Sequence, residues 1–231
     1  MPERFALISS PETVRAAFAY GDEPAFPPRY NIAPTQPIAI VTAAPQARGG
    51  ARRFGLARWG FLPGFVKDPA KFPLLIKARA ETLTERPSFR AAVKRRRCLV
   101  PADGWYEWLR DGRGAPKRTF LVRRRDSAPM GFAGLMETWI DPHGGEIDTA
   151  CIVTIAANRL IAPIADRMPA ILAPADCAAW LDNDSVGAEP AIGLLRRAPE
   201  DALVLIAIGS AVNRVGAEGP QVQRPLESPA V

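Results

Sequence analysis

Histidine and cysteine are scarce in this chain of 231 residues, which has one histidine and three cysteines. The histidine, His143, lies in residues 141–145 (Asp-Pro-His-Gly-Gly), a run that predicts a hairpin loop. A single loop histidine argues against a zinc site and a histidine-based catalytic triad, so we expect neither a metal nor a cofactor. Cys98, Cys151 and Cys177 are widely spaced and form no Cys-x-x-Cys motif, which is typical of a reduced, cytoplasmic protein.

Long apolar runs, internal repeats and an N-terminal signal peptide are also missing. No apolar run approaches the roughly 20 residues that a membrane-spanning helix needs, so we expect no membrane partner. Hydrophobic residues make up 48% of the chain, which is enough to bury a core without disulfides. The composition therefore predicts one soluble domain over residues 1–231.

Acidic residues are fewer than basic ones, 24 against 30, which gives a net charge of +6. The basic residues are clustered at Arg52-Arg53, Lys77 with Arg79, Lys94 to Arg97, Lys117-Arg118 and Arg123 to Arg125. Such clusters suit a surface that follows a phosphate backbone, and Trp59, Phe61 and Phe65 are rings that could stack on bases. Basic runs are more often solvated strand ends, the interpretation we favour for residues 123–125 before a predicted turn. For residues 94–97 the two interpretations are equally supported.

Short strands dominate the expected organisation. Strands are predicted over 38–42, 53–59, 74–80, 98–100, 105–109, 119–122, 131–139, 150–156 and 203–207. Ser10 and Pro11 begin a helix that runs to about Ala19, and further helices are predicted over 87–95, 174–181 and 192–197. The proline-rich residues 24–37 predict an extended loop, and Asp111-Gly112 a turn. This pattern favours an α+β fold, a single domain with a curled, mainly antiparallel sheet and peripheral helices.

Residues 97–108 carry the most informative pattern in the chain. They predict a buried strand, a tight turn at Asp103-Gly104 where glycine adopts positive φ, and a second strand with Glu107 among Trp105, Tyr106 and Trp108. A carboxylate held against aromatic rings loses solvation, which raises its pKa and suits it to general acid or base catalysis. The alternative is a surface glutamate on an amphipathic strand.

Strand alternation over residues 74–81 predicts Leu75, Lys77, Arg79 and Glu81 on one face and the apolar residues on the other. If that polar face lines a groove, Lys77 and Arg79 point toward a nucleic-acid backbone. Lys77 then has two possible roles. It is a phosphate contact or an ion-pair partner of Glu81 or Glu107, which we favour, or it is an amine that forms an imine.

Several segments in the same order resemble motifs of the SOS-response-associated peptidase (SRAP) family, which captures abasic sites in single-stranded DNA. They are residues 29–34 (Arg-Tyr-Asn-Ile-Ala-Pro), 59–64 (Trp-Gly-Phe-Leu-Pro-Gly), 78–82 (Ala-Arg-Ala-Glu-Thr), 97–108, 166–169 (Asp-Arg-Met-Pro) and 212–213 (Val-Asn). The similarity extends from Met1 to about Pro225.

The resemblance implies an open barrel-like sheet, a monomer, and binding of single-stranded or abasic-site DNA in the cytoplasm, at the nucleoid after damage. The DNA-binding positions that it implies are Arg4, Asn31, Phe65, Arg79 and Trp108.

The catalytic positions that the resemblance implies are mostly substituted. The family begins Met-Cys-Gly-Arg-Phe, whereas this chain begins Met-Pro-Glu-Arg-Phe, so Pro2 stands where the nucleophilic cysteine is expected. Lys77 stands at the family's catalytic asparagine, Ala165 at its histidine, and only the glutamate is kept, as Glu107. The family's thiazolidine crosslink needs an amine and a thiol on the same residue. We therefore expect neither that crosslink nor self-cleavage.

Three functions remain open, and whether the chain is an enzyme is open with them. The first is binding of single-stranded or damaged DNA without a crosslink. The second is a reversible Schiff base with an abasic site through Lys77 or Pro2, with Glu107 moving protons and strand cleavage by β-elimination. An α-amine has a pKa near 8, and Pro2 would expose one if Met1 were removed, as in the formamidopyrimidine-type glycosylases that also begin Met-Pro-Glu. The third is a groove adapted to a protein or small ligand.

Overall fold

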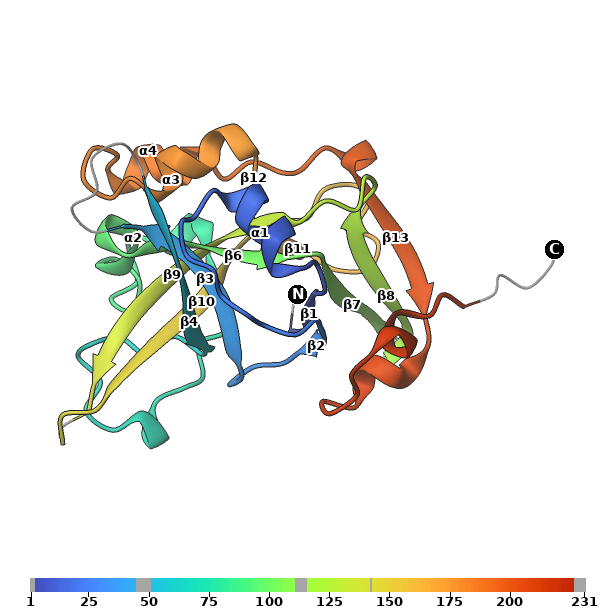
Figure 1. The fold of residues 1–231 in the computed structure, drawn as a ribbon, viewed down its shortest axis with the longest axis horizontal. Coiled ribbons are helices and arrows are strands. Elements are labelled where there is room, and N and C mark those ends of the chain that lie inside the picture. Colours follow the sequence, from blue (N-terminus) through green and yellow to red (C-terminus); the bar gives the residue numbers. More distant parts are fainter. Residues whose placement is uncertain (1–2, 45–50, 111–115, 142, 227–231) are drawn as a thin grey trace.

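Two β-sheets with short helices at their edges make up most of the molecule (Figure 1). The computed structural model describes residues 3–44, 51–110, 116–141 and 143–226 of the chain. The fold is α+β with mainly antiparallel strands, as the alternation in the sequence predicts.

The larger sheet has eight strands and closes on itself. The ring runs β10, β4, β3, β6, β9 and back to β10, because β10 pairs in parallel with β4 and antiparallel with β9. The ring strands are β3 (Pro37–Ala43), β4 (Arg52–Trp59), β6 (Arg97–Ala102), β9 (Met130–Ile140) and β10 (Glu146–Ala156). Three short strands flank it: β5 (Lys77–Arg79), β11 (Arg167–Pro169) and β12 (Ile171–Leu172).

The smaller sheet has five strands in the order β13-β8-β7-β1-β2 and is antiparallel throughout. Its strands are β1 (Phe5–Leu7), β2 (Arg29–Ile32), β7 (Gly104–Arg110), β8 (Pro116–Arg124) and β13 (Leu203–Ile208). The N-terminal strand β1 thus lies between β7 and β2, and the chain just before it reaches the site described below.

The helices are short and peripheral. The α-helices are α1 (Pro11–Phe18), α2 (Ala92–Arg95), α3 (Cys177–Leu181) and α4 (Ala188–Gly193). The 3₁₀ turns are η1 (Pro69–Lys71), η2 (Ala80–Thr82), η3 (Pro174–Asp176), η4 (Glu200–Ala202), η5 (Ser210–Asn213) and η6 (Pro220–Gln223). Ser10 caps α1, since its Oγ accepts a hydrogen bond from Thr13 N at 3.3 Å. The helix ends at Ala19, whose φ is 52°.

Aromatic side chains join the two sheets in one core. Phe5 of β1 packs edge-on against Trp59 at 5.1 Å and against Phe132 at 6.2 Å between ring centroids. Trp105 of β7 meets the same Phe132 at 6.0 Å. All four rings are buried, and rings of this size contribute most to the burial of apolar surface. The position of β7 relative to the barrel is therefore fixed by packing.

Asp103 and Gly104 form a corner between the sheets, because β6 belongs to the larger sheet and β7 to the smaller one. The Asp103 carboxylate accepts hydrogen bonds from Ile8 N at 2.5 Å and from Ser9 N at 2.7 Å. The expectation that Gly104 needs positive φ is wrong, since the positive-φ glycines of the described residues are elsewhere. Glycine is required instead by close approach: a Cβ here would lie 2.8 Å from Val122 O.

Most predicted strands are confirmed, including the β9–β10 hairpin around His143. The predicted loop over 24–37 is partly wrong, because β2 forms within it and pairs with β1. The strand predicted over 74–80 is shorter, and of the helix predicted over 87–95 only the last turn is α-helical. The helix predicted over 192–197 lies earlier, in α4. The predicted turn at residues 111–112 lies outside the described residues.

In the part of the chain that the structure describes, no helix combines the length and apolar character needed to cross a bilayer.

Candidate functional site

Three distant segments enclose a hollow of about 350 Å³ beside the carboxylate of Glu107. They are the chain just before β1, represented by Glu3, the second half of β7, and the loop that precedes β11. The lining residues are Glu3, Glu107, Trp108, Leu109, Arg110, Ile164 and Asp166. The sequence did not indicate Glu3 or Asp166 as lining residues. Each is next to a candidate position, Glu3 to Arg4 and Asp166 to Ala165.

Glu107 lies on β7 with only 1% of its surface exposed, between the buried Tyr106 and the half-buried Trp108. The alternative of a surface glutamate is therefore wrong. Burial raises the pKa of Glu107, which is the largest influence on it; the Glu3 carboxylate acts in the same direction and the Trp105 side chain in the opposite one. A carboxyl group with a raised pKa keeps its proton to higher pH and can then donate it, as a general acid must.

Lys77, on β5, forms an ion pair with Glu3, with 3.3 Å between Nζ and Oε1. Because Glu3 also lines the hollow, this contact connects Lys77 to the carboxylate site. The expected partners of Lys77 were Glu81 or Glu107. Glu81 instead pairs with Arg167 at 2.7 Å, and that arginine also donates to Thr154.

The strand β5 presents its side chains as the alternation predicts: Lys77 is half-buried, Ala78 is buried and Arg79 is exposed. Ala165 lies in the loop between Ile164 and Asp166, both of which line the hollow. The position that corresponds to the family's histidine is therefore next to the hollow but carries only a methyl group. Pro2 lies outside the described residues.

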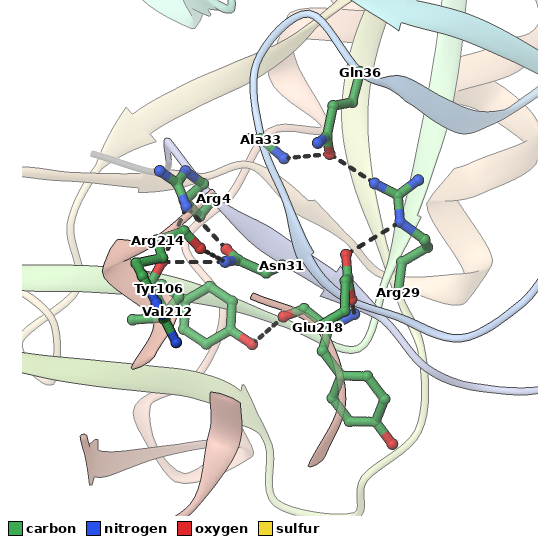
Figure 2. Close-up of polar contacts among 10 residues, drawn as sticks. Arg4, Arg29, Asn31, Ala33, Gln36, Tyr106, Val212, Arg214 and Glu218 are labelled. Atoms are coloured by element: carbon green, nitrogen blue, oxygen red, sulfur yellow. Dashed lines mark hydrogen bonds and ion pairs between the residues drawn. The ribbon is translucent and has the colours of Figure 1, made fainter. Parts of the chain in front are cut away.

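Arg4 and Asn31 form a buried network with the chain beyond β13, shown in Figure 2. Arg4 Nη1 donates to Asn31 Oδ1 and to Val212 O, both at 3.0 Å. Asn31 Nδ2 donates to Val212 O at 3.1 Å and to Arg214 O at 2.8 Å. Asn31 has no exposed surface, so its side chain is not open to DNA, contrary to expectation. Its role in this structure is to hold β2 against the C-terminal segment.

A second set of contacts extends this network along β2, also in Figure 2. Arg29 forms an ion pair with Glu218 at 3.4 Å and donates to Gln36 Oε1 at 2.6 Å. Tyr106 donates through its hydroxyl to Tyr30 O at 2.5 Å. Nothing in the sequence pattern indicated these pairs. The partners of two of them are far apart along the chain, and Arg29 and Gln36, seven positions apart, lie on either side of a turn.

Trp108 and Phe65 differ in their surroundings. Trp108 lines the hollow, half-buried, and donates through Nε1 to Asn213 Oδ1 at 2.8 Å. Phe65 is 61% exposed in the loop after β4, where it packs edge-on against Phe72 at 6.3 Å. The other two rings that were expected to stack on bases, Trp59 and Phe61, are fully buried, so that expectation is wrong for them.

The basic clusters separate into structural and exposed members. Arg97 is 1% exposed and its guanidinium donates to backbone carbonyls, so it is not part of a phosphate-binding surface. Lys94 and Arg95 next to it are exposed. Arg124 pairs with Asp126, which fits the interpretation of residues 123–125 as the end of a strand.

The three cysteine thiols lie away from the hollow and are buried. Burial raises the pKa of the Cys98, Cys151 and Cys177 thiols, which lowers their reactivity because the thiolate is the nucleophile.

The fold and the hollow together define a protein with a closed β-barrel, a second sheet packed on it, and a buried carboxylate at the junction. A family model for "SOS response associated peptidase (SRAP)" matches residues 1–215, and the chain belongs to this family. Abasic site processing protein YoqW of Bacillus subtilis (strain 168) is 34% identical over 223 residues, 95% of this chain and 97% of that protein. Abasic site processing protein YedK of Escherichia coli (strain K12) is 28% identical over 216 residues, 93% of this chain and 91% of its own. A solved structure from Bacteroides thetaiotaomicron has the same fold, with a TM-score of 0.85 at 22% identity over 97% of this chain and all (100%) of its own.

Proposed function

We propose that this chain binds single-stranded DNA that contains an abasic site, as part of the DNA-damage response, and does not form a stable thiazolidine crosslink. The observation that carries the proposal is the buried carboxylate of Glu107 in a hollow of about 350 Å³. Similarity to proteins named abasic site processing proteins supports the substrate class. We propose further that residues 1–231 act as one domain, as a monomer in the cytoplasm.

Exposed groups outside the hollow would supply contacts to the DNA strand. Arg79 is exposed on β5, where its guanidinium can bind a phosphate. The Phe65 ring is 61% exposed, which leaves a face free to stack on a base. Trp108 and Arg4 stand closer to Glu107, and their fixed hydrogen bonds suit them to shape the site more than to follow the strand.

The lack of a crosslink follows from the available nucleophiles. Position 2 is proline, so no residue at the start of the chain offers an amine and a thiol together. The three thiols elsewhere are buried.

A second candidate is reversible Schiff-base chemistry, favoured by the position of Lys77, whose contact with Glu3 places its amine beside the hollow. The unprotonated amine of Lys77, or of Pro2, would attack the C1′ aldehyde of the open sugar to give a carbinolamine. Loss of water, with a proton from the Glu107 carboxyl, would give the iminium. The resulting carboxylate could then remove a C2′ proton, and the 3′ phosphate would leave by β-elimination.

A denaturing gel of the protein with abasic-site single-stranded DNA, with and without borohydride, tests both candidates. We expect a shift on a native gel and no band in either denaturing lane. A band only after reduction would establish an iminium, and Lys77→Ala would then distinguish Lys77 from Pro2. Lys94→Ala, at an exposed lysine on α2, is the matched control. A band in both lanes would refute the absence of a stable crosslink.

Absence of a shift on the native gel, meaning no binding of the abasic-site DNA, would refute the DNA-binding proposal itself. The hollow would then serve a protein or small ligand, the remaining alternative.

A further inference from the structure

A second hollow, of about 470 Å³, opens where the edges of the two sheets approach each other. One wall is β12, at the edge of the larger sheet, and another is the start of β13, at the edge of the smaller sheet. The connection from α4 to β13, which crosses between the sheets along the top of Figure 1, forms the third wall. This hollow shares no lining residue with the one beside Glu107.

The walls of the second hollow are aliphatic. Ile171 and Leu172 contribute from β12, Leu203 from β13, and Leu194 and Ala198 from the connection. None of its lining residues is aromatic. Single-stranded nucleic acids are usually bound by stacking on aromatic rings, so these walls suit aliphatic or aromatic side chains of a protein better than bases.

The rim of the hollow is cationic. Arg124, Arg196 and Arg197 line it together with one acidic residue, Asp176, and Arg124 is paired with Asp126 outside the hollow. Arg196 is largely exposed and reaches Asp176 at 3.3 Å. Arg197 is exposed, and no ion pair among the described residues involves it. An apolar cleft with an arginine rim is complementary to a segment that carries carboxylates around large apolar side chains.

We propose that this hollow docks an acidic, apolar-anchored segment of a partner protein. The apolar side chains would enter between Leu172, Leu194 and Leu203, and the carboxylates would pair with Arg196 and Arg197. The site lies apart from the Glu107 hollow, so a partner could be held while that hollow is occupied. The proposal does not depend on the DNA-binding proposal.

Fluorescence anisotropy with a labelled peptide that alternates aspartate and leucine tests the proposal on the full chain. We expect saturable binding, about tenfold weaker for the double variant Arg196→Glu and Arg197→Glu. The matched control is Lys94→Glu with Arg95→Glu, the same charge change at exposed positions on α2, with affinity within about twofold of the parent chain. Ala173→Trp, which fills the hollow from an exposed lining position and keeps every arginine, should abolish binding.

Four results would overturn the proposal. Equal binding of a peptide with serine in place of leucine would mean that charge alone attracts the probe. Unchanged affinity of the Arg196 and Arg197 double variant, with an unchanged melting temperature, would place the peptide elsewhere. A deoxythymidine oligonucleotide that binds the parent chain but not this variant would make the hollow a nucleic-acid site. If the parent chain self-associates and the Arg196 and Arg197 double variant does not, the occupant of the hollow would be a second copy of the chain.

Discussion

Arg97 provides a test of whether a basic cluster belongs to the core or to a DNA-binding surface. Its guanidinium donates to four backbone carbonyls: Trp180 O at 2.5 Å, Val93 O at 2.7 Å, Asp182 O at 2.6 Å and Val186 O at 2.8 Å. Its charge also lies 5.7 Å from the centre of the Trp180 ring. These contacts attach α2, α3 and the chain after α3 to the start of β6. Arg97→Met keeps much of the side-chain volume and removes every donor.

The loss of stability can be estimated from these contacts. Hydrogen bonds from a charged donor contribute about 1.5–3 kcal/mol each, a gross loss of about 6–12 kcal/mol for the whole set. The variant no longer has to desolvate a buried guanidinium, which offsets several kcal/mol of this loss. The net decrease in the free energy of unfolding is then about 4 kcal/mol. Since about 1 kcal/mol shifts the melting temperature of a chain this long by 2–4 °C, Arg97→Met should lower it by about 8–16 °C.

Thermal and urea unfolding followed by circular dichroism would measure this change, with Arg95→Met as the exposed neighbour for comparison. Arg95→Met should change stability by about 0.5 kcal/mol or less. DNA affinity of folded Arg97→Met should stay within about twofold, because the side chain is 1% exposed. A loss below about 1 kcal/mol, or a large loss of DNA affinity without loss of stability, would refute the structural role.

Three further predictions concern the candidate site and the corner between the two sheets at Gly104. Glu107→Gln should become more stable relative to the parent protein as pH rises from the glutamate pKa of the unfolded chain through the raised pKa of the folded one. The reason is that the parent protein loses free energy of unfolding over that window, in which the unfolded chain gives up the Glu107 proton before the folded one does. Urea unfolding curves over a pH series measure this, and a constant stability difference between the two proteins would contradict it. Arg79→Ala should weaken binding of single-stranded DNA and reduce the slope of log affinity against log salt by about 1, and an unchanged salt slope in a titration would count against a phosphate contact. Gly104→Ala should cost about 1–3 kcal/mol, since its Cβ would lie 2.8 Å from Val122 O, and Gly64→Ala, which has open space, is the control in the same melting assay.

Short sequence patterns predicted the parts of the fold that are determined by residues close together in the sequence. The cap of α1 needed only Ser10 and Pro11, and the β9–β10 hairpin needed only two alternating runs around a turn. The aromatic neighbours of Glu107 allowed a buried carboxylate without deciding between that and a surface glutamate, and the fold decides it, with 1% of its surface exposed. The cap and the hairpin, in contrast, depend on residues within a few positions of one another.

Long-range partners explain what the sequence could not predict. Arg97 ends a run of basic residues for which a solvated strand end and a phosphate-binding surface were equally supported, yet its side chain is buried and its acceptors lie up to 89 positions away. β2 forms in a proline-rich stretch because β1 and the C-terminal network hold it there. Trp59 and Phe61 are followed by a loop with an exposed ring at Phe65, and only the tertiary fold shows that the first two are buried.

The residues that match the family motifs do not all bear equally on function. Arg4 and Asn31 satisfy one another and the carbonyls of the C-terminal segment, so folding alone accounts for their presence. Removing either would leave buried polar groups without partners. Glu107 is different, because its raised pKa means that burial disfavours its charged form and so reduces stability at neutral pH. Glutamine would occupy nearly the same volume without that cost. A carboxyl group whose burial opposes folding, at the wall of a hollow, is typical of a functional site, and the proposed function therefore depends on Glu107 more than on Arg4 or Asn31.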